Sequence, residues 1–414
     1  MKRLLPLLAL LGLAGCLAPD QPELTREIPW ALVATPLVMD SHSHTRFSDG
    51  NLSVAELVRK AVENGCDALA ITDHSDLSVR AATPAYFEAI DQARRDHPEI
   101  LLFAGLEWNV PPYGGREHMA LLLAPDKERL LAQFRRRFEP EEADALAGLR
   151  WLAERAPSRR DGVAFYAHPS RKQTSRQAIR EDFLRWHTAS PLLAGFEGAP
   201  GHQKNRPIGS YRTHFRTLDR WDPVVAGIDD TWDNLLDQGY DVWGALTVSD
   251  YHNHHMDEPP CAFARLHVLA EDPSHGGVLA GLRAGSFWSD HGRLLDRLDF
   301  VLHTPGLPLP ASPGEAVRLP PDHPVTLAVT LERGPGAAGS PLVLELIGNG
   351  LAGEPQLIAE KSLPAGATRA QWTFDELKPG ADGRSAYFRL RVRKAMADGP
   401  DLLAHSNPIR LYLD

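Results

Sequence analysis

The sequence predicts an α/β domain followed by a small all-β module, and three observations carry this prediction. Between about Pro36 and His303, short apolar runs alternate with helical segments, which is typical of βα units and parallel strands. Seven prolines then lie from Pro305 to Pro324 and indicate a linker. Beyond the linker, strand-like runs continue between Gly and Pro turns without helices, which favours a β-sandwich.

These changes of composition set the expected domain boundaries. We expect a signal segment at 1–16, a tether at 17–35, the α/β domain at 36–304, the linker at 305–324 and the β module at 325–414. A chain of 414 residues with 43% hydrophobic residues is long enough for a large core and about two domains.

The first elements of the α/β domain show how helices and strands are assigned. The run Leu37–Met39 is the first strand. Ser53 to Glu56 has the spacing of a capping box, apolar residues then recur at helical spacing up to Val62, and Gly65 is placed to end the helix. The next strand is Ala68–Thr72, and further helices are expected near 84–96, 140–155, 173–187 and 275–284.

The β module is expected to contain about six short strands. Neither of its two histidines, His323 and His405, has neighbours of metal-ligand type, so we interpret the module as structural or as a binding domain. The expected strands are Val325–Leu331, Leu342–Ile347, Leu357–Glu360, Arg369–Phe374, Ala386–Val392 and Pro408–Leu413.

The first residues have the form of an export signal. Lys2 and Arg3 precede the apolar run Leu4–Leu13, which is too short to span a bilayer as a normal helix. The segment that ends at Cys16 resembles the bacterial lipoprotein signal, in which this cysteine carries the lipid. A plain secretory signal is the alternative. We expect a lipid-anchored protein on the periplasmic side. Because Leu17 rather than Asp follows Cys16, the outer membrane is slightly favoured over the inner membrane.

Charge and cysteine content narrow the class of protein. A net charge of -10 at pH 7 excludes a broad electrostatic attraction to nucleic acid or to an anionic membrane. An anionic substrate would therefore need local positive charge, which bound metal would supply. Cys66 and Cys261 are far apart and form no disulfide framework. Cys66 is interpreted as a buried small side chain, and pairing of the two cysteines stays open.

Polar residues of metal-ligand type lie at or near the ends of seven apolar runs. His42 and His44 are two residues apart, so on an extended strand they point to the same face, as do Asp250 and His252. His118 begins its run, which suggests that this strand runs in the opposite direction. The candidate ligands are His42, His44, Asp49, His74, Glu107, His118, His168, Asp250 and His252.

Taken singly, each of these residues could be a satisfied core histidine or a turn residue. The carboxyl ends of strands in an α/β barrel converge on one mouth. So many imidazoles and carboxylates at one mouth would repel one another or lack solvation unless cations neutralise them. The set therefore predicts a metal site.

At this point the sequence resembles the PHP (polymerase and histidinol phosphatase) domain over roughly residues 36–290. Within that family, the chain is most similar to the carbaryl-hydrolase-like branch. The features that carry this similarity are the lipoprotein start, the segments Trp232–Gly239 and Leu282–Gly285, and the trailing β module. The motifs that carry the resemblance are Asp40-x-His42-x-His44, Asp49, Thr72-Asp73-His74, Glu107, His118, Ala167-His168-Pro169 and Ser249-Asp250-x-His252.

The resemblance implies a distorted seven-stranded (β/α) TIM-like barrel with two or three divalent ions. One ion would be held by His42, His44, Glu107 and Asp250; a second would share Glu107 and add His118 and His168; a third would take Asp49, His74 and His252. The mixed ligand set fits Zn²⁺, Mn²⁺ or iron, and Asp49 favours the harder Mn²⁺ or Fe²⁺.

The implied activity is metal-dependent hydrolysis of a small-molecule phosphoester by a hydroxide that bridges two ions, with Glu107, Asp250 and Asp73 as candidate catalytic residues. Asp73 would act by orienting His74 or a neighbouring ligand, and a cap of the following loop is its alternative. Hydrolysis of a carboxyl ester or carbamate at the same site is an alternative. A non-catalytic surface lipoprotein that binds glycan or protein is the alternative from another class. The candidate substrate contacts are Arg171, Lys172, Glu197 and His202. The oligomeric state stays open.

Overall fold

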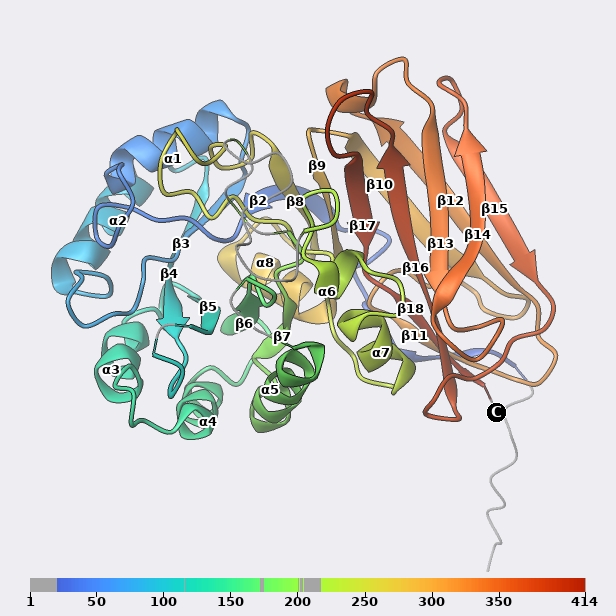
Figure 1. The fold of residues 1–414 in the computed structure, drawn as a ribbon, viewed down its shortest axis with the longest axis horizontal. Coiled ribbons are helices and arrows are strands. Elements are labelled where there is room, and N and C mark those ends of the chain that lie inside the picture. Colours follow the sequence, from blue (N-terminus) through green and yellow to red (C-terminus); the bar gives the residue numbers. More distant parts are fainter. Residues whose placement is uncertain are drawn as a thin grey trace, which may run out of the picture.

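The computed structural model describes residues 21–114, 116–171, 175–199, 201, 204 and 217–413. The first part of the chain alternates strands with helices, and α1 to α5 lie on its outer side (Figure 1). Its elements are β2 (Thr35–Asp40), α1 (Val54–Glu63), β3 (Ala68–Ile71), α2 (Pro84–Asp96), β4 (Leu101–Asn109), β5 (His118–Leu123), α3 (Leu130–Phe138), α4 (Ala145–Arg155), β6 (Gly162–Ala167), α5 (Arg176–Ala189), β7 (Leu193–Phe196), α6 (Pro223–Ala226), α7 (Thr231–Asp237), β8 (Ala264–Ala270), α8 (His275–Ala284) and β9 (Phe287–His291).

The second part packs strands against strands, beside α6 and α7 (Figure 1). One sheet has the order β10-β12-β15, and β13, β14, β16, β17 and β18 belong to the larger sheet. The elements of this second part, called the β-rich part below, are β1 (Glu23–Arg26), β10 (Leu295–His303), β11 (Ala316–Leu319), β12 (Val325–Arg333), the 3₁₀ turn η1 (Pro335–Ala337), β13 (Leu342–Gly348), β14 (Gln356–Leu363), β15 (Arg369–Phe374), β16 (Ser385–Lys394), β17 (Leu402–Ser406) and β18 (Ile409–Leu413).

The boundary between the two parts differs from the expected linker. β11 lies inside the segment 305–324, where it pairs with β1 and β18. β10 precedes this segment, yet it pairs with β12 over Leu295–His303. The second part therefore begins about thirty residues before residue 325 and also recruits β1 from the N-terminal side.

The strands that position the candidate ligands follow the order β8-β2-β3-β4-β5-β6-β7. β2, β3 and β4 are parallel, as are β6 and β7. β5 runs antiparallel to β4 and β6, which confirms the reversed direction expected from the position of His118. The reversal brings the first residue of β5 to the same edge as the last residues of its neighbours.

The prediction of a seventh barrel strand at residues 247–252 is wrong, and the described strands do not close into a barrel. This segment makes isolated parallel bridges instead, at Thr247 with Ala199 and at Tyr251 with Ser43. Asp250 has a φ of +44°, a left-handed conformation that cannot continue an extended strand. The sheet continues from β8 through β9 into β17 of the second part.

Local sequence signals explain the helices that were expected. The capping box at Ser53 and Glu56 is formed, and α1 buries its apolar stripe, including Leu57 and Val58. α2, α4, α5 and α8 lie within or close to their expected ranges. α3, α6 and α7 were not expected. No helix in the described ranges is long and apolar enough to cross a membrane.

Two covalent and ionic links tie distant segments together. Cys66, just before β3, forms a disulfide with Cys261, which closes the question that the sequence left open. Arg389 of β16 makes a bidentate ion pair with Asp233 of α7 at 2.7 and 2.8 Å, and both side chains are fully buried. The helix α7 is thereby fastened to the β-rich part.

Candidate metal centre

The nine candidate ligands come together at or just beyond the ends of β2, β3, β4, β5 and β6, in the loop after β2 and on the segment 249–252. Three groups of side chains place one nitrogen or oxygen each within 4.8 Å of one another. These groups are His42, His44 and Glu107; His74, Glu107 and His118; and His44, Asp49, His74 and His252. His44 thus joins two groups, and His74 approaches Glu107 as well as Asp49, unlike the division that the family resemblance implied.

Glu107 is the centre of the arrangement. Its Oε1 lies 2.7 Å from Nδ1 of His118 and 2.9 Å from Nε2 of His168. Its Oε2 lies 2.8 Å from Nδ1 of His74, with His44 and His42 at 3.4 and 3.5 Å. The side chain is 1% exposed, so five imidazoles converge on one buried carboxylate.

The Oε2 atom of Glu107 tests whether the residues fit a metal. This oxygen is buried and has no hydrogen bond in the part of the chain that the structure describes, although the His74 nitrogen is at contact distance. A buried carboxylate oxygen without a hydrogen bond is costly. Imidazole and carboxylate donors aimed at one point are the ligand types that zinc, manganese and iron bind, so the residues fit divalent metal.

The carboxylate of Asp250 belongs to the same cluster of side chains. Its Oδ1 lies 3.1 Å from Nε2 of His44, and the Nε2 atoms of His42 and His44 are themselves 3.1 Å apart. Nη1 of Arg171 lies 3.5 Å from Oδ2 of Asp250, with its side chain 29% exposed. Arg171 is therefore partly exposed beside the metal centre, and its contact with substrate stays a prediction.

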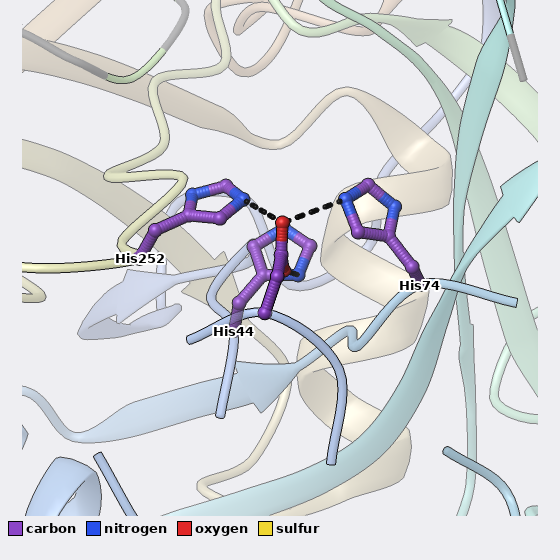
Figure 2. Close-up of side chains that lie close together, drawn as sticks. His44, His74 and His252 are labelled. Carbon is purple, nitrogen blue, oxygen red and sulfur yellow. Dashed lines mark ion pairs between the residues drawn. The ribbon is translucent and has the colours of Figure 1, made fainter. Parts of the chain in front are cut away.

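The third group faces solvent. Figure 2 shows His44, His74 and His252 around a carboxylate oxygen, which belongs to Asp49. Asp49 lies 3.4 Å from His252, 3.6 Å from His74 and 3.7 Å from His44, and its side chain is 54% exposed. This edge of the centre is accessible to a ligand from solution.

The imidazoles have opposing electrostatic preferences. Burial lowers the pKa of His44 and of His168 to about 3. Burial would also lower the pKa of His74, but the Glu107 carboxylate overrides it and raises this pKa to about 10. His44 and His168 are therefore held neutral, which is the protonation state that ligates metal, within the same cluster that favours charge on His74.

Glu197 has a different role from the expected contact with substrate. It is fully buried, and its Oε1 lies 2.8 Å from Nδ1 of His42. The hydrogen bond leaves Nε2 of His42 directed at His44 and Glu107. Such a carboxylate fixes the ring orientation and tautomer of a metal-ligating histidine, so the structure corrects the sequence-based assignment of Glu197.

The contacts of Asp73 fit the positioning role that was expected for it, although they reach the loop before Asp49 and not His74 itself. Its carboxylate accepts hydrogen bonds from the backbone N–H and the hydroxyl of Thr45, at 2.8 and 2.6 Å. It also accepts from the backbone N–H and the hydroxyl of Ser48. Burial raises its pKa to about 6. Asp73 therefore holds the turn that leads to Asp49. The predicted residues Cys16, Lys172 and His202 lie outside the described residues.

Several supporting residues were not found from the sequence. The Asp40 carboxylate accepts from the backbone N–H of both His42 and Ser249 and so joins the two segments that carry ligands. Arg135 donates to the carbonyls of Ser75, Val79 and others of the loop after His74. An arginine on the apolar face of a predicted helix would have been the available signal for Arg135.

Comparison with known proteins finds a family model and a relative that each match part of this chain. Residues 40–138 match the PHP domain family. An uncharacterized protein of Methanocaldococcus jannaschii is 39% identical over 75 residues, 18% of this chain and 34% of that protein, so the chain spans about a third of its length.

Two solved structures are similar at low identity. One is a two-domain protein from Bacteroides vulgatus that contains a predicted PHP-like metal-dependent phosphoesterase. It is 17% identical to this chain, the match covers 96% of this chain and 100% of that chain, and the TM-score is 0.44. The other is an amidohydrolase from Chromobacterium violaceum with bound sulfate, with 17% identity, 53% and 89% coverage, and a TM-score of 0.34.

Proposed function

Because residues 40–138 carry a PHP domain, we propose that this protein is a metal-dependent hydrolase that acts on a phosphoester. The observation that carries the proposal is Glu107, a buried carboxylate approached by five imidazoles with one oxygen left without a hydrogen bond. Bound divalent ions would lower the pKa of a water molecule and polarise the oxygen of the ester.

The charge of the site favours an anionic substrate. One divalent ion in each of the three groups would bring six positive charges against the three carboxylates Asp49, Glu107 and Asp250. The buried acids around the ligands, Glu197, Asp40, Asp73 and Asp257, would offset up to four more, and Arg171 adds one. The ions and Arg171 would place positive charge locally in a chain of net charge -10, and this favours a phosphate ester over a neutral carboxyl ester.

The protein residues would bind and orient rather than react covalently. Arg171, at the mouth, would contact the phosphoryl oxygens, and a guanidinium suits this because it binds phosphate in a bidentate way. Glu197 would hold His42, and Asp73 would hold the turn before Asp49. These roles also serve the carbaryl-hydrolase-like alternative, in which the same metals would act on a carboxyl ester or carbamate.

We also propose that the protein is exported and held at a membrane by a lipid on Cys16. The disulfide between Cys66 and Cys261 supports export, because structural disulfides persist in oxidising compartments such as the periplasm. Mass spectrometry of the cell-derived mature protein would test this proposal. An unprocessed or unlipidated Cys16 would contradict it.

Hydrolysis by protein lacking residues 1–16 tests the proposed activity. The substrates are p-nitrophenyl phosphate, bis-p-nitrophenyl phosphate and p-nitrophenyl acetate, with and without chelator. We expect phosphoester hydrolysis that chelator abolishes. His42→Ala and Asp250→Ala should remove it while circular dichroism stays unchanged, and His303→Ala, an exposed histidine of β10, is the matched control.

The pattern of activity separates the alternatives. Activity on the acetate alone would favour the carboxyl-ester reading. Metal-loaded protein that hydrolyses none of the three esters would favour a metal-stabilised binding protein and contradict the proposed function.

A further inference from the structure

The loop after β6 carries two residues near the metal centre, His168 and Arg171. His168, the first residue of the loop, is anchored by its contact with Glu107 and by the pairing of Ala167 with His118. Arg171 lies three residues further, where the chain turns through a hydrogen bond from its N–H to the carbonyl of His168. The position of Arg171 therefore depends on its ion pair with Asp250 and on what fixes the residues between it and His168.

Asp222 fixes this loop. Its carboxylate accepts from the backbone N–H of Ser170 at 2.9 Å and from the Ser170 hydroxyl at 2.6 Å. Its own N–H donates to the carbonyl of Gly198, directly after Glu197, at 2.8 Å. Asp222 and Ser170 are both fully buried. One buried carboxylate thus joins the loop of Arg171 to the end of β7.

Residues of the β-rich part hold Asp222 from behind. Asp222 caps α6 through the N–H of Val224, and Nη1 of Arg391 in β16 donates to the carbonyl of Ala226 at the other end of this helix. The buried pair of Arg389 and Asp233 fastens α7, which packs beside α6. The β-rich part is therefore connected to the mouth of the metal centre through α6, Asp222 and Ser170.

We propose that Asp222 is a positioning residue that holds Arg171 in place to bind the anionic group of the substrate, and that the β-rich part supports this function through α6. The proposal rests on the proposed hydrolase function for its kinetic consequence only. The clamp itself is a property of the folded chain and can be tested without turnover.

The test replaces the carboxylate by a carboxamide, Asp222→Asn. The amide keeps one acceptor oxygen but loses the other, and a hydrogen bond to a charged acceptor is worth enough for about a tenfold effect. We expect the KM for p-nitrophenyl phosphate to rise about tenfold, with kcat and bound metal nearly unchanged. Ser170→Ala should act in the same direction. Asp126→Asn, with a side chain 73% exposed, is the charge-matched control.

A double-mutant cycle shows whether Asp222 acts through Arg171. In an Arg171→Gln background, Asp222→Asn should raise the KM no further. An equal rise in both backgrounds would overturn the proposal, because it would mean that Asp222 affects the site by another route. A fall in metal content that accompanies the rise in KM would do the same.

Chemical labelling of Arg171 tests the clamp independently of activity. Phenylglyoxal modification, followed by peptide mass spectrometry, should be several-fold faster at Arg171 in Asp222→Asn than in the unmodified chain. Arg297, with a side chain 61% exposed, is the internal reference. Unchanged labelling of Arg171 would overturn the proposal. Faster labelling in a protein that hydrolyses no ester would refute the proposed function and leave the clamp standing.

Discussion

The role of Glu197 provides a quantitative test of how the metal centre is organised. Glu197→Gln replaces a buried carboxylate that accepts from Nδ1 of His42 at 2.8 Å. Losing such a partner of a ligating histidine lowers metal affinity by roughly 10- to 100-fold, or about 1.4–2.8 kcal/mol. Because Glu107 and His44 still hold the same ion, we expect weakened binding and not its loss.

Competition with a chelating dye would measure this affinity in the unmodified and variant proteins. Glu128→Gln is the matched control, because Glu128 is also buried but pairs with Arg94 away from the centre. The control should leave metal affinity unchanged. An unchanged affinity in Glu197→Gln together with a raised KM would refute the assignment and restore a direct contact between Glu197 and substrate.

Three further perturbations test buried links elsewhere in the fold. Arg389→Met leaves Asp233 buried without its partner and should lower the free energy of unfolding in urea by about 3–5 kcal/mol. Most of this loss should be recovered when Asp233 is also replaced by Leu. Additive losses in the double variant would contradict a coupled pair. Burial lowers the pKa of His291 to about 3, so the unfolded chain takes up a proton first and stability is lost as pH falls from about 6.5 towards 3. At pH 5 this loss is about 2 kcal/mol relative to pH 8, and His291→Phe should remove it from urea-unfolding curves at the two pH values; an equal loss in the variant would contradict the assignment. Reduction of Cys66–Cys261, which are 195 residues apart, should lower stability by about 2–4 kcal/mol in the same unfolding experiment, and no change would mean that the bond contributes nothing.

The regular elements with strong local signals could be predicted from the sequence. The helix at 84–96 and the strand at Arg369–Phe374 have the bounds that were expected. α3 was missed because Arg135 lies on its buried face, where it binds loop carbonyls instead of contributing to an apolar stripe. β17 was missed because it pairs with β9 of the first part, and no local pattern reveals such a partner.

The identity of the candidate ligands could be predicted, but their grouping could not. Ligand-type residues at strand ends point to a shared edge, and the structure brings all nine together. Whether a buried acid such as Glu197 contacts substrate or a histidine depends on its direction, which follows from the turn after β7. Asp222 carried only a helix-capping signal before Pro223, and its contact with Ser170 joins residues 52 positions apart.

The metal content of the purified protein tests the central claim most directly. Protein lacking residues 1–16, prepared without added metal and measured by inductively coupled plasma mass spectrometry, should carry two or three divalent ions per chain. Removing them by dialysis against a chelator should lower the melting temperature, because nine imidazoles and carboxylates would then crowd together without neutralising charge. A protein that purifies without metal, and whose melting temperature chelator and added metal leave unchanged, would contradict the account.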